Sequence, residues 1–146
     1  MRITLDTAIL VRTNTKATGP AKKLLDAIQQ CGAVLVLSPF LIREVERVLW
    51  YPRIQAVYKL GDADIRQQLE YLQSFAEIVT PAEGPPVVLK DPDDDPVIYT
   101  ALAGAADVLC TVDGHFYEPD VLAFCTRYGI QIMDDVELLY VLRQEM

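Results

Sequence analysis

The sequence predicts a three-layer α/β/α protein, in which helices cover both faces of a central parallel sheet of about five strands. Short, unbroken apolar runs alternate along the chain with longer segments whose apolar residues recur at helical spacing. Strands that are buried on both faces have this unbroken apolar character, and parallel strands need the intervening helices as connections. A chain of 146 residues is long enough to bury a substantial core, so we expect a single domain over residues 1–146.

The first part of the chain predicts two strands joined by a loop and a helix. Residues 3–5 are apolar and partly β-branched, and they predict a first strand that Asp6 follows directly. Turn-forming residues fill 13–20, and the apolar spacing over 21–30 predicts a helix. The continuous apolar run 34–37 then predicts a second, buried strand.

The middle of the chain predicts two helices and a short extended segment. Ser38-Pro39 combines a helix cap with a first-turn proline, which predicts a helix that continues to Leu49. Tyr51-Pro52-Arg53 breaks this helix, and apolar side chains at helical spacing predict another over 62–76. Residues 78–79 predict a short strand or an extended connector.

After a loop at 81–86, the same alternation returns. The elements expected there are a helix at 95–105, a strand at 108–111, a helix or a loop followed by a helix at 118–128, a strand at 129–132 and a last helix that Asp134 caps.

The totals exclude some functions. The formal charge is −8 and the pI is about 4.5, so we expect no broad basic face of the kind that holds nucleic acid by its phosphates. No apolar run is long enough to predict a membrane span or a signal peptide. Cysteines 31, 110 and 125 are odd in number and lack a Cys-x-x-Cys zinc pattern, so we expect reduced thiols in a cytoplasmic protein.

The most unusual stretch is Asp91-Pro92-Asp93-Asp94-Asp95, which precedes an apolar, helix-like run. Helix capping accounts for one or two of these acids, because a carboxylate accepts the free amides of the first turn. It does not account for four, since like charges repel one another. A bound cation would remove the conflict, so the stretch is a candidate metal site.

Other acids lie just after predicted strands or within predicted helices. Asp6 and Asp113 come after the carboxyl ends of strands, where parallel α/β folds place their sites. Glu44 lies two turns into the helix after Ser38, and Asp95 begins the helix before the fourth strand. Folding can therefore gather these four acids, although a lone acid is usually a solvated surface group. Such carboxylates suit Mg²⁺ or Mn²⁺, whose characteristic use is phosphodiester hydrolysis.

Two other kinds of residue leave alternatives open. His115 is the only histidine, and a surface or packing role is favoured over a substrate contact beside Asp113. No Gly-x-Ser-x-Gly motif supports a serine hydrolase. Arg43 and Arg47 share a helix side with Glu44, where exposed ion pairs are favoured over phosphate contacts.

Taken in order, several short segments resemble the PIN-domain family of metal-dependent ribonucleases, and in particular its toxin components of toxin–antitoxin systems. The resemblance covers nearly the whole chain. It rests on ITLDT at 3–7, on the helix at 37–49 with its second acid at Glu44, on YPR at 51–53, on DPDDD at 91–95, on ADVLCTVD at 106–113 and on GIQIM at 129–133.

The resemblance implies a site and several partners. Asp6, Glu44, Asp95 and Asp113 would hold Mg²⁺ or Mn²⁺, with Asp94 as a helper or merely a helix cap. The substrate would be RNA, an antitoxin protein would cover the acidic pocket, and the protein would form a homodimer. Asp95 is chosen because its interval to Asp113 is the one usual in the family.

Two departures from the family pattern support a different reading of the function. Ala8 stands where relatives have Asn, and Gly114-His115-Phe116 lacks the extra acid that many relatives carry. The alternative is therefore a catalytically weakened module that binds RNA or protein. A phosphatase or phosphotransfer domain is disfavoured, because Asp6-Thr7-Ala8 lacks the second acid of an Asp-x-Asp motif.

Overall fold

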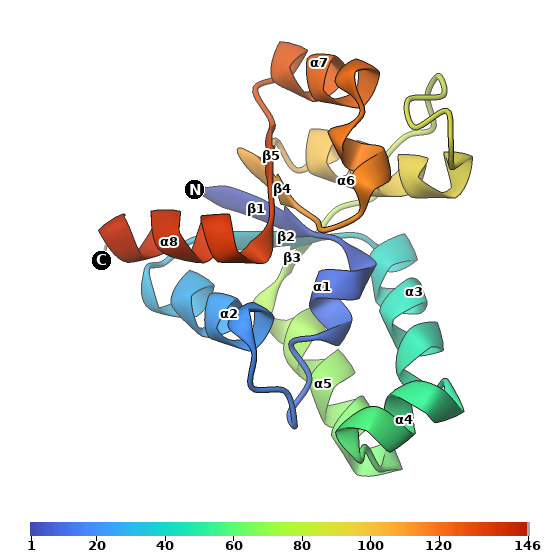
Figure 1. The fold of residues 1–146 in the computed structure, drawn as a ribbon, viewed down its shortest axis with the longest axis vertical. Coiled ribbons are helices and arrows are strands. Elements are labelled where there is room, and N and C mark those ends of the chain that lie inside the picture. The colour runs from blue at the N-terminus through green and yellow to red at the C-terminus, as the bar shows by residue number, and fades with distance from the viewer. Residues whose placement is uncertain (146) are drawn as a thin grey trace.

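The computed structural model describes residues 1–145 and contains one five-stranded sheet whose strands are all parallel (Figure 1). The strand order is β3-β2-β1-β4-β5. The strands are β1 (Arg2–Leu5), β2 (Val34–Leu37), β3 (Glu77–Ile78), β4 (Val108–Cys110) and β5 (Gln131–Met133). The predicted fold class is thus confirmed, including its strand number and direction.

Helices cover both faces of this sheet. Figure 1 shows α6 and α7 on one side of the strands and α1, α2, α3 and α5 on the other. The α-helices are α1 (Thr7–Val11), α2 (Pro20–Gln30), α3 (Pro39–Leu49), α4 (Pro52–Tyr58), α5 (Asp62–Phe75), α6 (Asp95–Ala103), α7 (Pro119–Arg127) and α8 (Asp135–Glu145). Two short 3-10 helices, η1 (Pro92–Asp94) and η2 (Gly114–Tyr117), flank the segment from α6 to β4. None of the helices over residues 1–145 has the length and apolar character needed to cross a membrane.

Two helices differ from the sequence-based expectation. The segment Tyr51-Pro52-Arg53, for which the sequence predicts only a break, follows α3 and also begins α4, with Pro52 in the first turn of α4. None of the residues of α4 is fully buried, although Ile54 and Tyr58 pack partly against the core. Its 7 residues give an apolar pattern too short to reveal the helix in the sequence. The five-residue α1 escapes prediction because it is little more than one turn long.

The central strands form the hydrophobic core of the fold. Ile3 and Leu5 of β1 and Leu109 of β4 have no exposed surface. All three cysteines, which lie inside the described chain, are free thiols, and Cys110 and Cys125 are buried. The chain leaves β1 toward β2 and β3 on one side, and it returns to β4 and β5 on the other. The carboxyl ends of β1 and β4 therefore mark the switch in strand order, where α/β sheets form their sites.

The approach of α6 to β2 predicts a large effect of a small substitution. Gly104 follows α6, and a Cβ atom on it would overlap the side chain of Val36. Because Val36 is fully buried, we expect Gly104→Ala to lower the free energy of unfolding by about 1–3 kcal/mol, as measured by urea unfolding. Val36→Ala in the same chain should recover part of that loss. An additive double mutant would contradict the contact.

Candidate metal centre at the carboxyl edge of the sheet

Asp6 lies at the bottom of the candidate site, directly after β1. One carboxylate oxygen caps α1 by accepting the Thr7 amide at 2.7 Å, and the other accepts the Thr111 hydroxyl at 2.8 Å. Asp6 is only 7% exposed, and this burial raises its pKa against the lowering effect of the two hydrogen bonds. The side chain is thus fixed at the switch in strand order.

Asp113 reaches the same place from β4. Its amide donates to the Thr111 hydroxyl at 3.1 Å, and one of its carboxylate oxygens accepts the His115 amide at 2.9 Å. Thr111 therefore contacts both acids, because its hydroxyl donates to Asp6 and accepts from Asp113. The charge of Asp113 raises the pKa of Asp6, and the charges of both carboxylates raise the pKa of Asp94, because like charges repel.

Asp94 is delivered by the 3-10 turn η1, just before α6. Its side chain is 18% exposed, and one carboxylate oxygen is buried without a hydrogen-bond partner among residues 1–145. The pKa of Asp94 is raised to about 7, first by burial and then by the charges of Asp91, Asp113 and Asp6, in that order of importance. Asp94 is thus the most strongly perturbed acid of the pocket.

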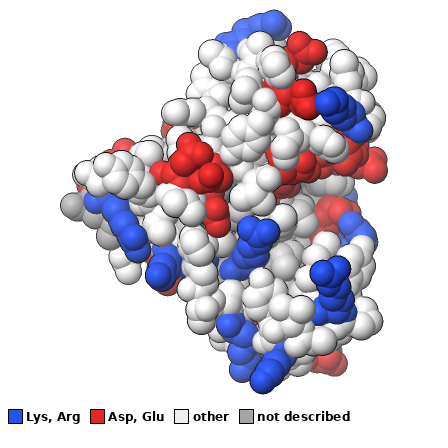
Figure 2. Space-filling view, in the orientation of Figure 1, with Lys and Arg blue, Asp and Glu red and all other residues white. Residues whose placement is uncertain are grey.

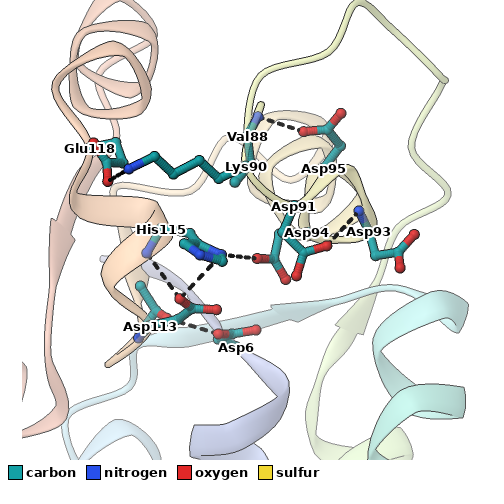
Figure 3. A network of polar contacts seen from close by, with 11 residues as sticks. Asp6, Val88, Lys90, Asp91, Asp93, Asp94, Asp95, Asp113, His115 and Glu118 are labelled. Atoms are coloured by element: carbon teal, nitrogen blue, oxygen red, sulfur yellow. Dashed lines mark hydrogen bonds and ion pairs between the residues drawn. The ribbon is translucent and has the colours of Figure 1, made fainter.

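Asp95, which the sequence nominated as the third acid, lies outside this cluster. Its carboxylate points to the far side of α6, where one oxygen accepts the amides of Val87 and Val88 at 3.1 and 2.7 Å (Figure 3). Asp95 thereby fastens the irregular segment that leads from β3 to η1. The position facing Asp6 and Asp113 belongs instead to Asp94, which the sequence considered only as a helper or a cap.

Glu44 stands on the opposite wall, on α3, where the sequence placed it. Its carboxylate pairs with Arg47 at 2.6 Å, one turn further along the helix. The structure therefore brings Asp6, Asp94 and Asp113 together on one wall and presents Glu44 across the pocket from them.

His115 and Asp91 are two members of the cluster that sequence reasoning did not select. The Nδ1 atom of His115 lies 3.8 Å from a carboxylate oxygen of Asp94 and 3.7 Å from one of Asp113 (Figure 3). Asp91 lies beside Asp94, and the two acids and the imidazole each offer a ligand atom within 4.8 Å of the others. The available signal was weak: His115 follows Asp113 by two residues, and Asp91 begins the acidic run.

The pocket around these acids has a volume of about 840 Å³ and two unlike walls. One wall is acidic. The wall that carries Glu44 also has the basic Arg12 and Arg47, together with apolar and aromatic side chains that include Phe40 and Tyr58. On the face drawn in Figure 2, acidic residues gather across the middle of the molecule, and most basic residues lie below them. The pocket can therefore take a cation and an anionic chain side by side.

The residues fit a divalent cation. Several carboxylates meet without a lysine or arginine between them on the acidic wall, and a buried oxygen of Asp94 lacks a partner within the described chain. Oxygen donors of this kind suit Mg²⁺ and Mn²⁺. An ion held there would relieve the repulsion that now raises the pKa of Asp94.

Fold and site together define a class: parallel α/β proteins with a carboxylate pocket for divalent metal at the switch in strand order. The sequence profile of one family with this design, described as the PIN domain, matches residues 2–115. The chain belongs to the PIN domain family, whose members are generally metal-dependent nucleases. No curated protein and no solved structure matches the chain.

The raised pKa values predict how the metal-free protein responds to pH. The pKa values of Asp6 and Asp94 in the folded chain lie above the ordinary aspartate value of 3.8. Both side chains therefore bind protons more tightly in the folded chain than in the unfolded chain. Between about pH 4 and 7 the folded state therefore holds more protons than the unfolded state, and the free energy of unfolding falls as pH rises. We expect urea unfolding in EDTA to give a lower stability at pH 7.5 than at pH 5.5. A flat or rising profile would contradict this assignment.

Proposed function

We propose that the protein is a Mg²⁺- or Mn²⁺-dependent endoribonuclease and the toxin of a toxin–antitoxin pair. In this proposal Asp6, Glu44, Asp94 and Asp113 hold the metal, with Asp94 in the place that the sequence assigned to Asp95. The observation that carries the proposal is the meeting of three carboxylates, one with a buried and unpartnered oxygen, at the switch in strand order.

The division of labour among the chain's own residues follows from their positions. When bound, a divalent cation supplies Lewis-acid stabilisation of the phosphate oxygens and of the attacking nucleophile. Asp6, held rigidly by Thr7 and Thr111, would fix the position of the ion. Glu44 would reach it from across the pocket, which requires the Glu44 carboxylate to loosen its exposed pairing with Arg47.

The second wall supports an RNA substrate. Arg12 and Arg47 line it and would neutralise phosphates, while Phe40 and Tyr58 offer ring faces for bases of a single strand. A local basic wall of this kind is what an acidic protein needs in order to hold an anionic chain.

This wall makes a specific prediction for Arg12. Because Arg12 is exposed and makes no metal contact in the proposal, we expect Arg12→Gln to raise KM several-fold while leaving kcat nearly unchanged. The salt dependence of RNA binding should weaken by about one unit of slope, since one phosphate contact is lost. Lys16→Gln, outside the pocket, is the matched control. An unchanged salt slope in Arg12→Gln would remove this residue from the RNA path.

The partner proteins are part of the same proposal. Trp50, Tyr51 and Val57 are exposed apolar side chains next to the pocket at α3 and α4, and Val57 is 66% exposed. We propose that an antitoxin covers this region and the acidic pocket, that the active form is a homodimer, and that the protein acts in the cytoplasm, where free thiols persist. Growth arrest on expression, relieved by a neighbouring gene product, would test the toxin role.

A second candidate function is a PIN-like module that binds RNA or protein without cleaving it. Ala8, which lines the pocket beside Asp6, favours it, because the family resemblance implies a hydrogen-bonding Asn at this position. The two candidates differ in a simple observation. A nuclease must cleave RNA with bound metal, whereas a binding module retains RNA intact whether or not metal is present.

The deciding experiment is cleavage of a labelled structured RNA by the purified protein with Mn²⁺, with EDTA and with Asp113→Asn. Asparagine keeps the oxygen that accepts the His115 amide, so the variant removes charge with little change of fold. Cleavage that disappears in both controls supports the nuclease. Cleavage that persists in Asp113→Asn refutes the assigned site, and intact RNA in every arm favours the binding module.

A further inference from the structure

The cluster of Asp91, Asp94 and His115 lies beside the carboxylates already discussed but has a different chemical character. It contains the only imidazole of the chain. One ligand atom from each of the three residues lies within 4.8 Å of the other two. Donor atoms bound at about 2.1 Å to one ion are themselves about 3–4 Å apart, so these side chains need to move little to share a cation.

Two atoms of the cluster are buried and lack a partner. A carboxylate oxygen of Asp94 and Nδ1 of His115 are inaccessible to solvent and form no hydrogen bond with any described residue. They face each other at 3.8 Å, which is too far for a hydrogen bond and short enough for a shared ion (Figure 3). A buried polar atom without a partner is unfavourable, and a cation held between these two atoms would satisfy both.

The surrounding contacts hold the cluster in this arrangement. The His115 amide donates to Asp113 at 2.9 Å, which fixes the backbone from which the imidazole extends. Lys90, next to Asp91, pairs with Glu118 at 2.6 Å and joins the acidic segment to the start of α7. Two segments far apart in the sequence thus present the two acids and the histidine to one another.

We propose that His115, together with Asp91 and Asp94, forms a second cation site that binds Mn²⁺ or another transition metal through nitrogen and oxygen. The site rests on the proposed function only in sharing Asp94 with the first metal pocket. Imidazole nitrogen suits Mn²⁺, Co²⁺ and Zn²⁺ better than Mg²⁺, which strongly prefers oxygen. His115 thereby makes this second site selective for transition metals over Mg²⁺.

The single histidine makes the test direct. In untagged protein, any imidazole nitrogen coupled to bound Mn²⁺ must belong to His115. We expect electron spin-echo spectra of the Mn²⁺-loaded wild type to show that coupling. His115→Gln should lose it, weaken Mn²⁺ binding about tenfold and leave the Mg²⁺ Kd unchanged within twofold. Asp93→Asn, an exposed acid of the same turn, is the matched control and should retain the coupling.

The outcomes separate this inference from the proposed nuclease. Bound Mn²⁺ without nitrogen coupling overturns the His115 site and leaves the carboxylate pocket intact. Nitrogen coupling together with uncleaved RNA supports the site and counts against the nuclease. Absence of any Mn²⁺ binding overturns both. Because the wild-type spectrum alone decides the ligand, the test holds even if His115→Gln fails to fold.

Discussion

Asp94→Asn is expected to lower Mn²⁺-dependent RNA cleavage by about a hundredfold or more, whereas Asp95→Asn should retain most of it. Asp94 faces the acidic pocket with an unpartnered oxygen, but Asp95 faces the amides of Val87 and Val88. The asparagine side chain has the same shape and lacks the charge that a cation needs. Single-turnover cleavage rates of the two purified variants measure the difference.

The same pair of variants should differ in stability, and in the opposite direction. In EDTA at pH 7.5, Asp94→Asn removes a carboxylate whose pKa is raised to about 7 by burial and neighbouring charge. We expect it to raise the free energy of unfolding by up to about 2 kcal/mol. Asp95→Asn should instead destabilise the chain, because the two amides lose a charged acceptor. Loss of cleavage in Asp95→Asn with an intact fold would return Asp95 to the metal site.

The second large effect concerns the metal itself. A cation that binds only the folded chain adds about 2.7 kcal/mol of stability at a hundred times its Kd. For a domain of this size, that corresponds to a rise in Tm of about 5–10 °C. We expect saturating Mn²⁺ to produce this rise in the wild type and Asp6→Asn to lose most of it.

The control for the metal effect is ionic strength. Equal ionic strength from NaCl screens the repulsion among the carboxylates without occupying the pocket. It should therefore raise Tm by much less than Mn²⁺ does. A similar rise from both salts, or a full Mn²⁺ effect in Asp6→Asn, would show that the ion acts by screening and not by binding at this site.

The sequence was a good guide to the elements that are buried and long. Runs such as 34–37 and 108–110 are apolar because both faces of the sheet are covered, so their composition alone indicates that they are buried. Asp6 and Asp113 could be located for the same reason, since each follows such a run. By contrast, no residue of α4 is fully buried, and its few partly buried side chains leave no comparable run of apolar residues.

The choice between Asp94 and Asp95 needed information that spacing does not carry. The chain passes from the 3-10 turn η1 into α6 at these two residues. Successive side chains turn by about 120° in a 3-10 helix and about 100° in an α-helix, so neighbours face different directions. The proximity of His115 to Asp94 was hidden in a similar way, because it depends on how η2 approaches η1 in space.

The contrasting duties of Asp94 and Asp95 restrict how this segment can change during evolution. A one-residue insertion or deletion between Asp91 and Pro96 would leave the composition almost unaltered, yet it would rotate the acids by about 100° about the helix axis. Asp94 would then no longer face the pocket, and Asp95 would no longer face the amides of Val87 and Val88. Related sequences should therefore tolerate substitutions at exposed Asp93 more readily than any change of length in this turn.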